Sequence, residues 1–86
     1  MKEIRWSVLK TRRLKRVRGV SFEEIVASEL ITVRKHPARE KQYIMFFKYK
    51  GYIWMVPFVE DNDHIFLKTL YPSRKYTRMH KRGELK

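Results

Sequence analysis

The chain has 86 residues, of which 21 are Lys or Arg and 9 are Asp or Glu, so that its formal net charge is +12. A chain of this length forms one domain with a modest core, because small chains bury only about 60% of their unfolded surface. The absence of cysteine excludes disulfides and thiolate chemistry. No apolar run approaches the ~20 residues that a membrane-spanning helix needs, and no signal-peptide core is present. We therefore expect a single domain over residues 1–86 that lies in the cytoplasm and does not enter a membrane.

The positive charge is concentrated in two parts of the sequence. Eight cations fall between Lys2 and Arg18 and seven between Lys68 and Lys86, whereas most of the acids lie between these segments. A strongly basic surface concentrates polyanions and speeds their association. Nucleic acid is therefore the first partner that the composition predicts, and an acidic protein segment is the second.

Two helices are expected after a short opening segment, residues 2–6, which is either an edge strand or an arm. Ser7 is a suitable N-cap, and no Gly or Pro interrupts the following sequence until Gly19. This first helix carries a strongly basic face. Ser21 and Glu24 predict a capping box at the start of a second helix, whose apolar residues have the spacing of a buried stripe.

Four strands are expected to follow the helices. Period-two alternation of apolar residues predicts strands around residues 31–34, 43–49, 52–60 and 65–71, joined by polar turns. Lys50-Gly51 is typical of a tight hairpin turn, and Pro57 implies a bulge or a gap in the ladder. The order predicts an α+β fold in which two N-terminal helices pack on a four-stranded antiparallel sheet. Residues 81–86 are expected to form a frayed tail.

The end of the last predicted strand carries a dense group of polar side chains. Ser73, Arg74 and Lys75 directly follow Pro72, which ends the strand because it has no backbone N–H to donate, and Lys68 lies on the strand itself. Two neighbouring cations at a rigid strand end are suited to hold a phosphate. The alternative interpretation is a core strand followed by a solvated basic tail, and composition alone favours that alternative.

The sequence lacks the residue groups that metal-dependent or nucleotide-hydrolysing chemistry requires. The three histidines are far apart, and no carboxylate pair or Gly-rich phosphate loop is present. RNA carries its own nucleophile, the 2′-hydroxyl, so its cleavage needs only charge stabilisation and proton transfer. Arg74 and Lys75, supported by Lys68, are candidates for the first task. His80 is the candidate for the second, because imidazole exchanges protons near neutral pH. We expect no metal ion and no cofactor.

The candidate site residues fall into two groups. The catalytic candidates are Lys68, Arg74, Lys75 and His80, and the residues expected to bind the RNA backbone are Arg12, Arg13, Arg16, Lys48, Lys50 and Ser73. Like charges crowded on the first helix repel one another, so an anionic partner would stabilise that helix. The alternative for this basic face is that it is only solvated.

Three segments together resemble a known family. They are residues 18–25 (RGVSFEEI), residues 51–59 (GYIWMVPFV) and residues 66–75 (FLKTLYPSRK), in that order. With these segments the chain resembles the BrnT-like toxins of bacterial toxin–antitoxin modules, within the wider RelE-like ribonuclease group. Relatives commonly have Tyr where His80 falls in this sequence.

The resemblance implies a RelE-like fold, cleavage of mRNA that inhibits growth, and neutralisation by an antitoxin encoded beside the toxin. Such antitoxins are often ribbon-helix-helix DNA-binding proteins, so operator DNA would be bound only through the antitoxin complex. The predicted function is that of a toxin acting as a metal-independent endoribonuclease. The alternative is a non-catalytic basic module that binds nucleic acid or docks an antitoxin.

Overall fold

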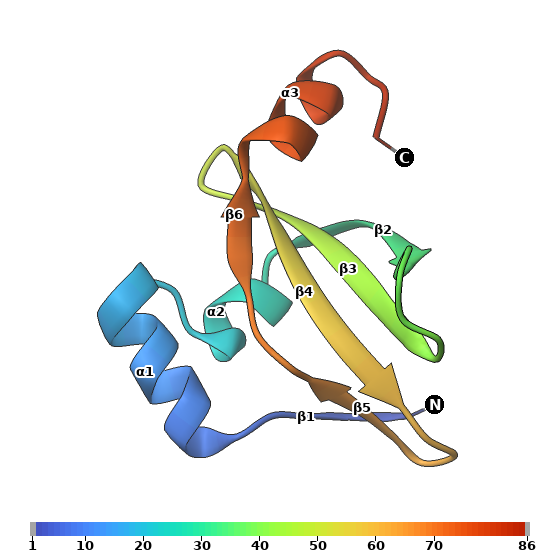
Figure 1. Cartoon of the computed structure of the whole chain (residues 1–86). Helices are drawn as coiled ribbons and strands as arrows, with labels where there is room; N and C mark the ends of the chain where they lie inside the picture. Colours follow the sequence, from blue (N-terminus) through green and yellow to red (C-terminus); the bar gives the residue numbers. More distant parts are fainter. Residues whose placement is uncertain (1, 86) are drawn as a thin grey trace.

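The structure, a computed structural model, describes residues 2–85 and places them in three helices and six strands. In chain order these are β1 (Glu3–Arg5), α1 (Val8–Arg18), α2 (Phe22–Val26), β2 (Glu29–Lys35), β3 (Gln42–Tyr49), β4 (Tyr52–Glu60), β5 (His64–Leu67), β6 (Tyr71–Ser73) and α3 (Arg74–Lys81) (Figure 1). The predicted α+β class is confirmed. The predicted arrangement of two N-terminal helices on a four-stranded antiparallel sheet is wrong, because the sheet is six-stranded and mixed and a third helix follows it. None of the helices in residues 2–85 has the length and apolar character needed to cross a membrane.

The sheet is mixed because β1 pairs in parallel with β5, from Glu3 beside His64 to Arg5 beside Phe66. The other pairings are antiparallel, and the strands lie in the order β1-β5-β4-β3-β2, with β6 paired to β4. The opening segment is therefore an edge strand rather than a free arm. Sequence periodicity gives no signal for this pairing, because three exposed residues are too few to define a period.

The predicted strand over residues 65–71 is divided into β5 and β6. β5 pairs with Phe58–Glu60 of β4, and β6 pairs with Ile53–Met55. Between the two, the N–H of Lys68 donates to the carbonyl of Pro57 at 2.8 Å. In a regular antiparallel pair the residue opposite Lys68 would also donate its own N–H to Lys68. Pro57 has no N–H, so this second hydrogen bond cannot form. The gap expected at Pro57 thus lies opposite the point where β5 ends.

The predicted turn at Lys50-Gly51 is confirmed as a tight hairpin between β3 and β4. Tyr49 pairs with Tyr52, which leaves two residues in the turn, and φ is 51° at Lys50 and 79° at Gly51. Two-residue turns of type I′ require positive φ at both central positions. The turn fixes the register of the two longest strands and places Tyr52 at the start of β4.

Helix α3 stands where the sequence was interpreted as a basic tail after Pro72. Ser73 caps the helix, because its Oγ accepts the N–H of Tyr76 at 3.1 Å. Tyr76 and Met79, three residues apart, turn toward the sheet and pack against a buried cluster. Pro72 does not end the strand as expected. It is the middle residue of β6, where it pairs with Trp54, and α3 starts directly after Ser73.

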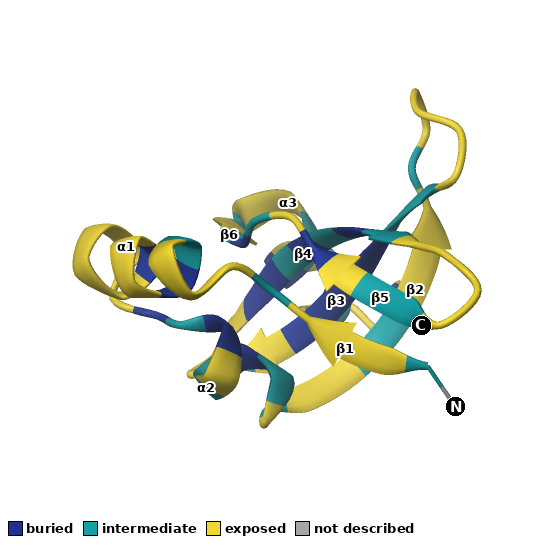
Figure 2. Cartoon of the chain, turned by 90° about the horizontal axis from the view of Figure 1, so that it is seen from below, coloured by how far each residue is buried: buried dark blue, intermediate teal, exposed yellow. Residues whose placement is uncertain are grey.

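The sheet has an apolar cluster on each face, and each cluster is covered by different helices. The larger cluster includes Phe22 and Ile25 of α2 with Leu14 of α1, Phe47 of β3 and Val56 of β4. The smaller cluster lies beneath α3 and includes Ile44, Phe46, Ile53 and Leu85. Successive residues of β3 and β4 alternate between the two clusters, as the period of a strand requires. Both strands are accordingly buried or half-buried along most of their length (Figure 2).

The segment after α3 is packed where the sequence predicts a frayed tail over residues 81–86. Leu85 is only 3% exposed and belongs to the cluster beneath α3. The N–H groups of Gly83 and Glu84 donate to the carbonyls of His80 and Met79 at 3.0 and 2.8 Å. Lys86 lies outside the described residues. The segment is otherwise polar, so its composition predicted a frayed tail although one apolar side chain, Leu85, anchors it.

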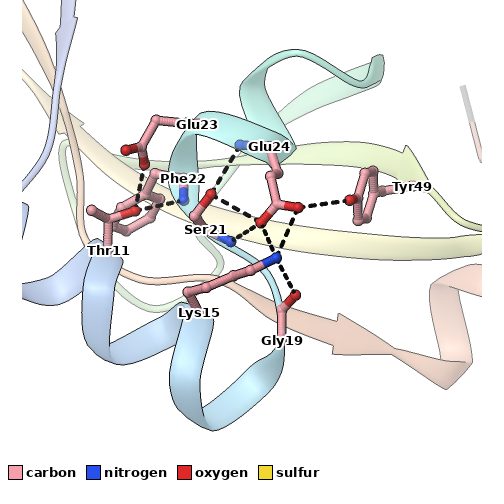
Figure 3. Close-up of polar contacts among 8 residues, drawn as sticks. All are labelled: Thr11, Lys15, Gly19, Ser21, Phe22, Glu23, Glu24 and Tyr49. Atoms are coloured by element: carbon pink, nitrogen blue, oxygen red, sulfur yellow. Dashed lines mark hydrogen bonds and ion pairs between the residues drawn. The ribbon is translucent and has the colours of Figure 1, made fainter.

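Helices α1 and α2 are joined by polar contacts around Glu24 (Figure 3). The predicted capping box is confirmed: Ser21 Oγ accepts the N–H of Glu24 at 3.2 Å, and the N–H of Ser21 donates to Glu24 Oε1 at 3.0 Å. Lys15 Nζ and the Tyr49 hydroxyl donate to the same carboxylate at 2.8 and 3.2 Å. These hydrogen bonds, that from Lys15 above all, lower the pKa of Glu24 from 4.5 to about 2.

Replacing this carboxylate should change how stability depends on pH. The pKa of Glu24 is lowered in the folded state to about 2, so its charge stabilises the fold fully above about pH 4.5 and progressively less as the pH falls toward 2. We expect Glu24→Gln to lower the melting temperature at pH 7 and to flatten its decline between pH 4.5 and 2. Circular dichroism melts at several pH values measure both effects. The exposed Glu29→Gln is the control, and equal pH profiles for wild type and Glu24→Gln would contradict the assignment.

Candidate functional site

Three surface hollows share Tyr52, the first residue of β4. Two of them, here called the α3 hollows, have volumes of about 180 Å³ each and also share Thr77 and Lys81. The third, here called the β6 hollow, has a volume of about 350 Å³ and is bordered by Pro72. Tyr52 is 46% exposed and therefore stands at the junction of the three.

The α3 hollows are lined by cations. One is lined by Lys48, Gly51, Tyr52, Ile53, Thr77, His80 and Lys81, and the other by Tyr52, Arg74, Thr77, Arg78 and Lys81. Neither lining includes an acidic residue. The ion pairs of residues 2–85 involve other basic groups, namely Lys2, Arg5, Lys15, His64 and Arg82. The charge in the α3 hollows is therefore available to an anion from solution.

The basic residues of α3 that border these hollows lie on one stripe of the helix. Arg74, Arg78 and Lys81 are spaced at i, i+4 and i+7, which places them one above another. At a rise of 1.5 Å per residue the stripe is about 10 Å long. Sequence reasoning missed Arg78 and Lys81 because it treated the segment as a tail. The spacing of the three cations after a Ser N-cap was the signal that would have found them.

Thr77 holds α3 against β4. Its hydroxyl accepts the N–H of Ile53 at 2.9 Å and donates to the carbonyl of Ser73, and the residue is 7% exposed. One position earlier, the ring of Tyr76 packs edge-on against Phe46 with centroids 4.7 Å apart. An isolated helix of eight residues is not stable in water. These contacts therefore determine where the cations of α3 lie.

Arg74 and Lys75 do not form the pair of cations that was expected at a strand end. Both belong to α3, in which consecutive side chains diverge by about 100°. Arg74 borders one α3 hollow and the β6 hollow, whereas the ammonium of Lys75 lies over the ring of Tyr76, 5.5 Å from its centroid. The expectation failed because the strand end is the start of a helix.

The other catalytic candidates are placed differently. His80 and Lys48 come together in the lining of one α3 hollow. The N–H of Lys68 contacts Pro57 of β4. Pro57 is four residues after Ile53, and Ile53 pairs with Ser73, the residue just before α3. Four strand residues span about 13 Å, so Lys68 lies apart from the α3 hollows.

The remaining candidates for backbone binding are scattered. Arg12, Arg13 and Arg16 are exposed on α1, which stands apart from α3 in Figure 1. Lys50 lies in the hairpin turn. The Oγ of Ser73 is engaged as the N-cap of α3. Their roles in RNA binding remain predictions from the sequence.

The chemistry available in the α3 hollows is electrostatic and acid–base. Besides Lys and Arg side chains, the linings contain His80 and Tyr52, residue types that serve as general acids or bases in enzymes. Within residues 2–85, no group of three or more His, Cys, Asp or Glu side chains is arranged to hold a metal ion. The arrangement can bind an anion and transfer a proton beside it.

The fold and this surface define a small basic α+β domain whose mixed sheet carries a short C-terminal helix. No protein-family model matches the sequence, and no curated protein is significantly similar to it. The structure is similar to the crystal structure of the Brucella abortus ribonuclease toxin BrnT, with a TM-score of 0.57 and 14% sequence identity. The match covers 85% of this chain and 97% of that chain. The predicted resemblance to BrnT-like toxins is thus confirmed at the level of the fold.

The contacts of Thr77 predict the effect of changing it. Thr77→Val keeps the shape of the side chain but leaves the buried N–H of Ile53 without its acceptor. We expect a loss of about 1–3 kcal/mol in the free energy of unfolding, measured by urea denaturation. Thr77→Ser retains the hydroxyl and should recover most of that loss. A valine variant as stable as wild type would show that the hydroxyl does not hold α3 in place.

Proposed function

We propose that this protein is the toxin of a type II toxin–antitoxin module and that it cleaves mRNA as a metal-independent endoribonuclease, thereby inhibiting growth. The observation that carries the proposal is the pair of α3 hollows, which are lined by cations and no acids. The fold that this chain shares with a ribonuclease toxin adds support. Cations beside an exposed aromatic ring suit the backbone and bases of single-stranded RNA.

The proposed reaction uses the nucleophile that RNA itself carries. The 2′-hydroxyl attacks the adjacent phosphorus and gives up its proton, the bond from phosphorus to the 5′-oxygen breaks, and a proton is delivered to that leaving oxygen, so that protons balance over the step. Arg74, Arg78 and Lys81 would stabilise the negative charge that develops on the phosphate. His80, in the hollow that also contains Lys48, would transfer the proton. Because Lys68 and Lys75 lie away from this surface, we assign them no part at the reacting phosphate.

The partner and compartment follow from the same proposal. We infer a cytoplasmic toxin that is neutralised by a cognate antitoxin, with operator DNA bound only by the complex of the two. A ribbon-helix-helix protein encoded by the neighbouring gene, purifying together with this chain, would support that inference. Arg12, Arg13 and Arg16 on α1 then offer a second basic surface, separate from the α3 hollows, for the backbone of a longer RNA.

Salt dependence tests the phosphate-binding role of α3. Arg78→Ala and Lys81→Ala each remove one cation from the α3 hollows. We expect each variant to bind a short single-stranded RNA more weakly and to reduce the slope of log Kd against log salt by about 0.7. Fluorescence anisotropy at several salt concentrations measures this slope. Arg39→Ala, which removes an exposed arginine between β2 and β3 that borders none of the three hollows, is the matched control and should leave the slope for a short RNA unchanged.

Substitution of His80 should affect RNA cleavage without affecting RNA binding. We expect His80→Ala to bind RNA as wild type does but to cleave it at least about 100-fold more slowly, because general acid–base catalysis contributes a factor of this order. Cleavage by wild type should persist in EDTA, and expression of the chain alone should arrest bacterial growth. RNA that is bound with a steep salt dependence but recovered uncut would instead support a non-catalytic nucleic-acid-binding module.

A further inference from the structure

The β6 hollow is not explained by phosphate binding. It is the most spacious of the three hollows that share Tyr52, at about 350 Å³, and is lined by Tyr52, Trp54, Pro72 and Arg74. Three of these four residues carry rings, and only Arg74 is charged. A largely apolar hollow thus lies directly beside a cationic surface, with one arginine common to both.

The pairing of β4 with β6 produces this lining. Trp54 pairs with Pro72, so the two side chains lie on the same face of the sheet, and Tyr52 lies two residues before Trp54 on that face. Trp54 is 9% exposed and Tyr52 is 46% exposed, so Tyr52 is the more accessible of the two aromatic residues that line the hollow.

We propose that the β6 hollow binds one base of a single-stranded RNA, stacked on the ring of Tyr52, while Arg74 holds the phosphate of the same nucleotide. This rests on the RNA-binding function proposed above. A ligand that suits the hollow has an apolar planar part and an anionic part next to it. A nucleotide combines the two, and bases of unpaired RNA commonly stack on aromatic side chains.

The roles of the two aromatic residues differ. The indole nitrogen of Trp54 is shielded from solvent and has no hydrogen-bond partner in residues 2–85. Because Tyr52 is much more exposed than Trp54, we assign the stacking to Tyr52 and treat Trp54 as a buried neighbour in the lining. Stacking alone accepts all four bases, so the size of the hollow, rather than hydrogen bonds, would set any preference among them.

The test is an abasic scan with the full chain. A trinucleotide with 2′-fluoro sugars, which cannot be cleaved through a 2′-hydroxyl, is compared with three versions that each lack one base. We expect one of the three to bind about tenfold more weakly and the others to bind nearly as well as the intact RNA, because base–aromatic stacking contributes roughly this factor. Anisotropy at constant salt measures the affinities.

Variants of Tyr52 show whether this residue provides the stacking. Tyr52→Leu should lower the affinity of the intact trinucleotide by a similar factor, remove the dependence on base position and leave the salt slope unchanged, since it removes no cation. Tyr52→Phe keeps the ring and should behave as wild type. Phe66→Leu is the matched control, because Phe66 is 40% exposed and lies on β5 outside the three hollows.

The outcomes distinguish the base site from the phosphate site. Equal affinities for the intact and abasic trinucleotides would overturn the base site, while salt slopes that still depend on Arg78 and Lys81 would leave the proposed function standing. An equal effect of Phe66→Leu and Tyr52→Leu would also overturn it. If no trinucleotide binds at all, the base site and the proposed function fall together.

Discussion

The location of the candidate site depends first on the docking of α3 against β4, in which the hydroxyl of Thr77 takes part. Thr77 links the backbone of β4 at Ile53 to the first turn of α3 at Ser73. Helix α3 is too short to be stable alone, so its cations have a fixed position only because the helix is docked on the sheet. The apolar cluster around Phe46 and Leu85 completes that docking. Tyr52, by contrast, is placed by the hairpin turn. The site therefore depends on two separate features, the docking of α3 and the turn between β3 and β4.

Elements with a strong local signal could be predicted from the sequence. The capping box at Ser21 depends on residues three apart, and the hairpin at Lys50-Gly51 depends on adjacent ones, so both are visible in a short segment. The parallel pairing of β1 with β5 joins residues about sixty positions apart and leaves no periodic trace. Helix α3 was missed because Pro72 was expected to end regular structure, whereas Pro72 lies within β6 and the helix starts two residues later.

The membership of the site could be predicted only in part, for a related reason. The prediction placed Arg74 and its sequence neighbour Lys75 together after the end of a strand. The helical period instead places Arg74 on one stripe with Arg78 and Lys81. His80 was chosen for its chemistry, and the structure places it in the lining of one α3 hollow with Lys48, while its role there stays a prediction. Tyr52 gave no signal, because an apolar residue at a strand start is ordinary. Its place in the lining of the β6 hollow arises from the pairing of β4 with β6, which is a contact between distant segments.

The apolar cluster beneath α3 has a consequence for how a substrate arrives. Ile44, Phe46 and Ile53 are 6%, 1% and 1% exposed, and swinging α3 away would bring all three into water. The helix is therefore a poor candidate for a moving lid. The hollows it borders lie at the surface with the helix in place. Under the proposed function, RNA would therefore bind and its products would leave without a gating step, and turnover would be governed by chemistry or product affinity rather than by loop motion.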